Sequence, residues 1–266
     1  GKAELTSYTL DQSRYGEVHP GHAVLVFVTE DFSRKKQVKL DYPSRAGADK
    51  VPILKLNFTK KFLTGIYPYS LMNSVFTPID VDKDPHSLKM STSVQEWCGH
   101  VFTQMNLREK GYDFSQYSYF EGEGDVQKNL PKAMLEDEIW NRLRIDPSSI
   151  PTGKVELIPS MFFSRLRHTP LGAAKAEISF AKAEGEFDEK TRSLIIKYPD
   201  LNRQLVIYFN KAFPYEIQGW DESYPGSPYG NARALTTKAR LNKRIQSAYW
   251  GKNGLADRKL RAELGL

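Results

Sequence analysis

LIIKYPDLNRQLVIYF, residues 194–209, is the stretch that decides the fold. Apolar side chains recur at alternate positions in 194–198 and again in 205–209, and this period of two is typical of a half-buried β-strand. The two runs are separated by Pro199, Asp200, Leu201 and Asn202, a spacer rich in turn-forming residues. The stretch therefore predicts an antiparallel hairpin.

The same pattern recurs on both sides of this hairpin. AVLVFV (23–28) is a buried apolar run, VPILKLNF (51–58) alternates, and 88–102, 155–158 and 176–181 are shorter strand candidates. Residues 234–250 fit either a helix, with Leu241, Ile245 and Tyr249 on one stripe, or a strand with its odd-numbered residues from 235 to 249 on one face. The β-favouring Thr236 and Thr237 favour the strand.

Few segments show a helical period. The clearest is 131–144, which opens with Pro131, carries Leu135, Ile139 and Leu143 at helical spacing, and is stopped by Asp146 and Pro147. A second, short helix is expected at 256–264. Because a long sheet with so few helices must still bury one face, we predict a mainly β fold: a long curved antiparallel sheet, half-barrel or barrel-like, that wraps one central helix. We expect a single β-rich domain over 1–266, with two sub-layers divided near 130–150.

Composition excludes several classes of protein. Of the 266 residues, 40% are hydrophobic and 26% are charged, which excludes a disordered chain, collagen and a coiled coil. Cys98 is the one cysteine, so the chain has no intramolecular disulfide and no cysteine-rich zinc or iron–sulfur site. No window approaches the length of apolar sequence that a transmembrane helix needs. The chain opens with Gly1 and shows no signal peptide, from which we expect that a leader has been removed.

The basic residues are concentrated at one end. The formal net charge is +6, and residues 231–266 hold nine basic side chains against Asp257 and Glu263. Such an end predicts binding to anionic lipid or polysaccharide, although a solvated face is the alternative interpretation. The residues that would form this anionic-surface site are Lys238, Arg240, Arg244, Arg258 and Arg261.

One short stretch contains residues that could perform catalysis. In QEWCGH (95–100), a strand would place Glu96, Cys98 and His100 on one face, with neighbours about 7 Å apart. A cysteine nucleophile needs an imidazole within hydrogen-bond reach, so a Cys98–His100 hydrolase requires a bend near Gly99. The alternative is a buried structural cysteine with Trp97 packing on the opposite face.

Aromatic side chains are the candidates for a ligand groove. Such clusters line lipid-binding grooves, but they also simply fill cores. The candidate groove residues are Trp97, Tyr112, Phe114, Tyr117, Tyr119 and Trp220. Because the aromatic residues are not interleaved with Lys or Arg, we expect no nucleic-acid partner.

Metal and nucleotide motifs are weak. His19 and His22 provide two ligands at most, and EGEGD (121–125) lacks the Gly-Lys-Ser/Thr ending of a phosphate-binding loop. We therefore predict no metal site and no cofactor.

Four stretches together resemble a known family. They are AELTSYTLDQSRYGEVHPGHAVLVFVTEDFS (3–33), LNFTKKFLTGIYPYSLMNSVFTPID (56–80), SVQEWCGHVFTQMN (93–106) and IQSAYWGKNGLADRKLRAELGL (245–266). They are similar to uncharacterised bacterial envelope lipoproteins, many of which carry the name septum formation inhibitor Maf. The Ser-Pro-Arg-Arg motif of the true Maf pyrophosphatases is absent, so the resemblance implies no such activity. It implies export, a lipid attached to a cysteine that this sequence lacks, and residence at the periplasmic side of the envelope.

The second half of the chain has a looser likeness. PTGKVELIPSMFFSRLRHTPLG (151–172) and IIKYPDLNRQLVIYFNKAFPYEIQGWDESY (195–224) resemble curved-sheet proteins of the outer-membrane lipoprotein carrier type. Neither resemblance defines catalytic residues. Our leading hypothesis is a non-enzymatic, lipid-anchored envelope protein whose curved sheet binds a lipid, an acyl chain or a partner in an apolar groove.

Overall fold

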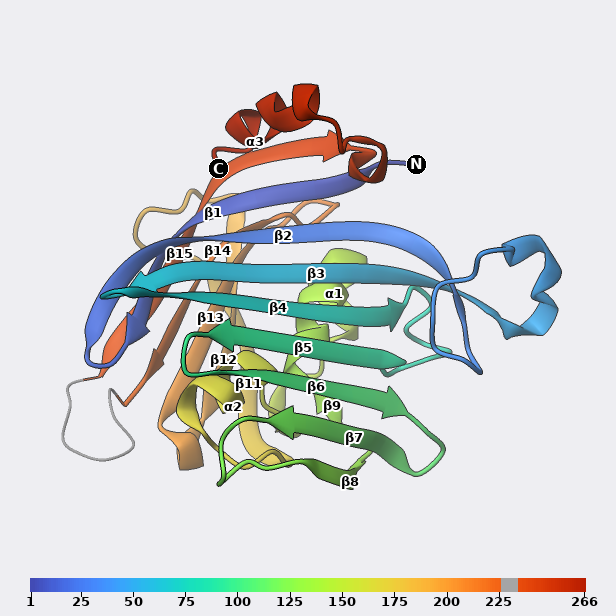
Figure 1. Ribbon diagram of the computed structural model, residues 1–266, viewed down its shortest axis with the longest axis horizontal. Coiled ribbons are helices and arrows are strands. Elements are labelled where there is room, and N and C mark those ends of the chain that lie inside the picture. Colours follow the sequence, from blue (N-terminus) through green and yellow to red (C-terminus); the bar gives the residue numbers. More distant parts are fainter. Residues whose placement is uncertain (226–233) are drawn as a thin grey trace.

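A single long sheet organises the molecule (Figure 1). The computed structural model describes residues 1–225 and 234–266, and in these ranges fifteen strands join one sheet in the order β8-β7-β6-β5-β4-β3-β2-β1-β15-β14-β13-β12-β11-β10-β9. The predicted mainly β fold with a curved sheet is confirmed. The strands are β1 (Ala3–Arg14), β2 (Glu17–Ser33), β3 (Lys50–Thr64), β4 (Tyr67–Pro78), β5 (Lys89–Glu96), β6 (Gly99–Leu107), β7 (Gly111–Ser118), β8 (Val126–Pro131), β9 (Met134–Leu135), β10 (Gly153–Ile158), β11 (Ala174–Lys182), β12 (Thr191–Tyr198), β13 (Arg203–Asn210), β14 (Ile217–Tyr224) and β15 (Leu235–Ser247).

Strand pairing follows the chain outward from the middle of the sheet. Consecutive strands pair antiparallel from β1 to β8 and from β10 to β15, and the two wings meet where β1 pairs with β15. The pairing of β9 with β10 is parallel, because the helix between them returns the chain in the same direction. The link at 132–133 joins β8 and β9, which are the last strands at the two ends of the sheet.

The hairpin predicted at 194–209 is confirmed. Leu194 pairs with Ile207 and Ile196 with Leu205, and all four side chains are buried. Asn202 closes the turn with φ 47°, in the left-handed region that asparagine tolerates.

The strand predicted at 234–250 is also confirmed, with one correction. Ser7 pairs with Lys243 whereas Tyr8 pairs with Leu241, so Asn242 is an extra residue in β15. Such a β-bulge interrupts the alternation of side chains. The predicted single face of odd-numbered residues from 235 to 249 is therefore wrong beyond Asn242.

The central helix is present, but it is shorter than predicted. Helix α1 spans Glu136–Ile145, because Pro131 ends β8 and Met134–Leu135 forms β9. Its Ile139 and Leu143 are buried in the interior, as their spacing indicated. The prediction of one interior helix is wrong, because a second one, α2 (Met161–Arg167), also lies against the sheet (Figure 1).

Helix α2 is short, and its residues Met161 to Leu166 are all buried. Ser160 caps its start by accepting a hydrogen bond from the Phe162 N–H at 3.2 Å. His168 ends it in the left-handed conformation at φ 53°. The expected C-terminal helix is split into a 3₁₀ turn, Leu255–Arg258, and α3, Lys259–Glu263.

Aromatic rings fill the interior around α1. Trp140 from α1, Trp220 from β14 and Phe58 from β3 contact one another with ring centroids 5.2–5.3 Å apart. These contacts are edge-to-face, which is a favourable geometry for aromatic pairs. The concave face of the sheet is a packed core in this half, so the apolar groove expected there is filled by side chains.

Candidate functional site

The predicted cysteine–histidine pair does not share a strand face. Trp97 and Cys98 form the turn of the hairpin between β5 and β6, so the strand expected to run from 88 to 102 is wrong at this point. Gly99 allows the tight approach of Tyr119, because a Cβ at Gly99 would lie 2.6 Å from that ring. Cys98 and His100 are both exposed to solvent.

The surroundings of Cys98 disfavour a thiolate. Its backbone N–H donates to Glu96 Oε2 at 2.6 Å. A hydrogen bond and the negative charge of Glu96 raise the pKa of the Cys98 thiol above its ordinary value. A nucleophilic cysteine needs the opposite shift, so this arrangement does not support the predicted hydrolase.

The six predicted groove residues occupy different environments. Tyr112 and Trp220 are buried in the core, whereas Tyr117 on β7, Tyr119 and Trp97 are exposed. Of the six, only Phe114, on β7, lines the pocket under helix α2 that is described below. The six residues do not line one groove. Phe114 and Tyr117, for example, are three positions apart on β7, and this odd separation places their side chains on opposite faces of the sheet.

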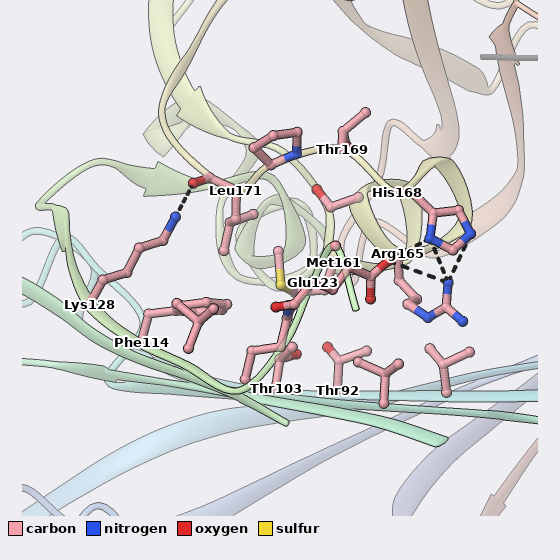
Figure 2. Close-up of a pocket in the computed structure, with 17 residues that line it drawn as sticks. Thr92, Thr103, Phe114, Glu123, Lys128, Met161, Arg165, His168, Thr169 and Leu171 are labelled. Atoms are coloured by element: carbon pink, nitrogen blue, oxygen red, sulfur yellow. Dashed lines mark hydrogen bonds and ion pairs between the residues drawn. The ribbon is translucent and has the colours of Figure 1, made fainter. Parts of the chain in front are cut away.

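A pocket lies between the concave face of β5–β8 and helix α2 (Figure 2). Its floor is made of cross-strand pairs of short side chains. Thr92 pairs with Thr103, and Val94 pairs with Val101. Their small size leaves a cavity of about 190 Å³ under α2, which we call the α2 pocket. Its lining residues are Thr92, Val94, Val101, Thr103, Phe114, Gln116, Gly122, Glu123, Val126, Lys128, Met161, Ser164, Arg165, His168, Thr169, Pro170 and Leu171.

The two ends of the α2 pocket differ in chemistry. Figure 2 shows Arg165, His168 and Glu123 gathered at one end, and Lys128 and Leu171 at the other. Lys128 Nζ donates to the Leu171 carbonyl at 2.9 Å and lies 5.7 Å from the centre of the Phe114 ring. The pocket thus joins a floor of threonine and valine side chains to a charged end.

Arg165 is the most unusual group in the pocket. Its side chain is 7% exposed, yet its nearest carboxylate oxygens, of Glu96 and Glu123, are 3.7 and 3.8 Å away. The Arg165 Nε–H is buried and has no hydrogen-bond partner in the described part of the chain. Burial lowers the pKa of Arg165 from its ordinary value, and Glu123 acts in the opposite direction. A buried guanidinium with unused donors is costly unless an acceptor reaches it.

Glu123 and His168 hold the charged end in place. His168 Nδ1 and Glu123 Oε1 lie 2.5 Å apart, and Ser118 Oγ donates to Glu123 Oε2 at 2.8 Å. Burial on its own raises the pKa of Glu123, but the hydrogen bonds from His168 and Ser118 and the charge of Arg165 outweigh it. The pKa therefore lies below its usual value. Glu123 is consequently ionised at neutral pH.

Sequence reasoning missed this charged end. Arg165 and His168 are more than 40 residues from both Phe114 and Glu123, and nothing in their spacing indicates a shared site. The signal that was available is Ser160, which marks the start of a helix that carries both apolar residues and Arg165.

A second charged cluster is buried around α1. Arg203 donates to both carboxylate oxygens of Glu136, at 2.5 and 2.6 Å, and to Glu222 at 2.8 Å. Next to Glu136, Asp137 accepts a hydrogen bond from the Met161 N–H at 2.9 Å. Burial and the neighbouring charge of Glu136 raise the pKa of Asp137 to about 6. Because the Arg203 donors are matched by carboxylates, we interpret this cluster as structural.

The predicted anionic-surface residues fall into two groups. Arg240 pairs with Asp221 at 2.7 Å, and Arg244 pairs with Glu216 at 2.8 Å. These two arginines are engaged with the sheet itself. Lys238, Arg258 and Arg261 are exposed.

Exposed apolar side chains form a band along the hairpin ends of one wing. Tyr67 bridges two of these hairpins, because its hydroxyl donates to Tyr15 at 3.1 Å and its ring stacks on Trp97 at 6.5 Å. Ile66 and Trp97 are 82% and 68% exposed. We call Tyr15, Ile66, Trp97 and Tyr119 the hairpin-end band.

Within residues 1–225 and 234–266, no group of three or more His, Cys, Asp or Glu side chains is placed to hold a metal ion. In the same ranges, none of the helices has both the length and the apolar character needed to span a bilayer.

Comparisons with known proteins define the fold alone. No family model and no curated protein matches the sequence. A solved structure from Brucella abortus, the β-barrel-like protein of domain of unknown function DUF1849, is similar with a TM-score of 0.51 and 8% identity, over 92% of this chain and 96% of that one. The Aeromonas veronii immune modulator A covers 91% of this chain, but its TM-score of 0.14 carries no argument. The chain is thus similar in fold to a β-barrel-like protein of unknown function.

Proposed function

We propose that this chain is a non-enzymatic binding protein that holds one small amphiphilic molecule in the α2 pocket. The observation that carries the proposal is the buried Arg165 with an unused Nε–H at one end of the α2 pocket. A bound ligand that places an acceptor at this end would satisfy the guanidinium. A carboxylate suits that role, because its two oxygens match the planar fork of an arginine.

The size of the cavity narrows the ligand class. Pockets for drug-sized ligands measure about 300–1,000 Å³, whereas the α2 pocket measures about 190 Å³. The sequence analysis predicted an acyl ligand, and a pocket of this volume restricts that class to a short chain with a polar head. In the proposed pose the chain lies on Val94, Val101 and Phe114, and the head faces Arg165.

Location at the periplasmic side of a bacterial envelope, and attachment through a lipid, are part of the proposal. They are supported by the sequence resemblance to envelope lipoproteins. The exposed Cys98 with its raised pKa supports a binding role over a cysteine hydrolase.

Calorimetry with a series of unbranched carboxylates from butanoate to decanoate tests the site, with the alcohols of the same lengths as a second series. We expect the best carboxylate to bind at least about tenfold more tightly than its alcohol, which is about 1.4 kcal/mol. Arg165→Gln should abolish this preference, and Arg108→Gln, at an exposed arginine, should preserve it. Equal binding of acids and alcohols to both proteins would reject the role of Arg165.

Filling the cavity provides an independent test. Val101→Phe should abolish binding of every carboxylate, whereas Val38→Phe, at an exposed position, should not change it. Thermal unfolding of each variant reports whether it folds, and Thr103→Leu replaces Val101→Phe if the latter does not fold. A folded, cavity-filled variant that binds as the wild type does would show that the α2 pocket is not the site.

A further inference from the structure

The segment that follows β15 forms a separate surface on the outside of the sheet. It comprises the 3₁₀ turns Tyr249–Gly251 and Leu255–Arg258 and helix α3. Figure 1 shows it beside β15 and β1, close to the N-terminus and apart from α2. We call residues 249–263 the C-terminal platform.

The platform is fixed to the sheet on one side. Leu264 directly after α3 is 5% exposed, and its carbonyl accepts a hydrogen bond from Ser7 Oγ on β1 at 2.5 Å. Asn242 Nδ2 on β15 donates to the Gly265 carbonyl at 3.4 Å. Because these contacts anchor the end of α3, the platform presents a defined face to solvent.

Two large apolar side chains on the platform are exposed to solvent. Trp250 is 54% exposed and Leu255 is 86% exposed. A tryptophan and a leucine left in water lose the free energy that burial would give them. Tryptophan in particular prefers the interface between a bilayer and water.

Cations surround these two residues in the sequence. Lys252, Arg258, Lys259 and Arg261 are exposed, and none of them forms an ion pair within the described ranges. Of the platform's two carboxylates, Asp257 accepts a hydrogen bond from the Gly254 N–H at 3.1 Å. Arg240 and Arg244, by contrast, are paired with acidic side chains of the sheet. Four of the free cations of this end therefore lie on the platform, and the exposed Lys238 and Lys243 of β15 also form no ion pair within the described ranges.

We propose that the C-terminal platform docks on an anionic lipid bilayer, with Trp250 and Leu255 entering the headgroup region and the four cations contacting lipid phosphates. Apolar residues among unpaired cations are the combination that binds such interfaces. A polysaccharide would complement the charge but would leave Trp250 and Leu255 in water. This surface is separate from the α2 pocket and does not depend on the ligand proposed there.

Vesicle flotation tests the proposal with the full chain. Vesicles that contain phosphatidylglycerol should bind the protein, and vesicles of phosphatidylcholine alone should bind it at least about tenfold more weakly. Binding should fall between about 0.05 and about 0.5 M NaCl, because salt screens the attraction. Lys252→Glu/Arg258→Glu/Lys259→Glu should abolish binding, whereas Lys154→Glu/Lys175→Glu/Lys182→Glu, at exposed lysines of β10 and β11, should retain most of it.

A second pair of variants locates the apolar contact. Trp250→Ser/Leu255→Ser should weaken vesicle binding at least tenfold, and Ile66→Ser/Trp97→Ser in the hairpin-end band should leave it unchanged. Brominated lipids should quench tryptophan fluorescence in Trp97→Phe but not in Trp250→Phe, because Trp140 and Trp220 are buried.

Loss of binding only in the hairpin-end variant would overturn the proposal, as would a lack of binding to anionic vesicles. The platform would instead be assigned to polyanions if the protein bound dextran sulfate as tightly as vesicles and if substitution of Trp250 did not change that binding.

Discussion

The interior around α1 and the interior around α2 belong to the same sheet but are filled differently. Around α1, the rings of Phe58, Trp140 and Trp220 contact one another and leave a packed core. Under α2, Thr92, Thr103, Val94 and Val101 face the helix and leave the α2 pocket. The comparison teaches that side-chain volume, not strand topology, decides whether this curved sheet encloses a core or a cavity.

Polar groups follow the same division. In the packed half, Arg203 has two carboxylate partners, Glu136 and Glu222, at hydrogen-bond distance. In the hollow half, Arg165 contacts His168 at 3.3 Å and two carboxylates only at 3.7 and 3.8 Å, and its Nε–H has no partner among the described residues. The hydroxyl of Thr103 likewise has no partner there. A buried charged group whose hydrogen bonds are all made within the protein indicates a structural role. A buried group that lacks a partner next to a cavity indicates a place where a ligand can bind.

The largest expected contrast comes from a matched pair of phenylalanines. Phe58 and Phe114 are both buried, but Phe114 borders the cavity. Phe58→Ala should lower the free energy of unfolding by about 4 kcal/mol, and Phe114→Ala by about 2 kcal/mol, because an atom beside a void has fewer contacts to lose. Urea unfolding measures both. Equal losses would show that the two halves are equally packed.

A contrast of intermediate size concerns pH and the α1 cluster. Asp137 has a pKa raised to about 6, so the folded state holds its proton more tightly than the unfolded state. This contribution to stability is fully present below about pH 4 and is lost as pH rises through about 6. Between about pH 4 and pH 7, the free energy of unfolding of Asp137→Asn should therefore fall by about 1–3 kcal/mol less than that of the wild type. Parallel stability profiles of the two proteins would contradict the raised pKa.

The smallest contrast uses two threonines. Thr237 Oγ1 accepts hydrogen bonds from Gln12 Nε2 and the Ser13 N–H, both at 3.0 Å, whereas Thr103 Oγ1 is unpartnered within the described chain. Thr237→Val should cost about 1 kcal/mol of unfolding free energy, and Thr103→Val should cost about zero. A clear loss in the Thr103 variant, measured by the same denaturant titration, would reveal a partner such as a bound water at that hydroxyl.

Most of the sheet was predictable from local pattern. The hairpin at 194–209 and the strand over 235–247 follow from alternation, because each has one buried face. The start of α1 was misplaced because Pro131 also suits the end of a strand, and the apolar spacing of Leu135 and Ile139 does not show where the helix begins. The bulge at Asn242 has no signal in the alternation itself.

The site was less predictable than the fold, for a physical reason. Trp97 and Cys98 occupy a two-residue turn that lies inside an apparently continuous strand pattern, so the sequence placed Cys98 and His100 on one face. Cavities depend on which side chains face one another across the fold. Val101 and Arg165 line one pocket only because α2 folds back against β4 and β5, and the local sequence does not indicate that contact.

The pairing of β1 with β15 has a consequence for how the chain is made. Every other pairing in the sheet joins strands that are adjacent in sequence, whereas Ala3 of β1 pairs with Ser247 of β15. The two wings can therefore join only after β15 has been synthesised. Until then, one side of β1 presents unpaired amides that invite intermolecular association. Loop closure over so long a separation is slow. Folding of this protein should therefore be limited by the late pairing of β1 with β15. Nascent chains that end before β15 should be the species that depends most on a chaperone.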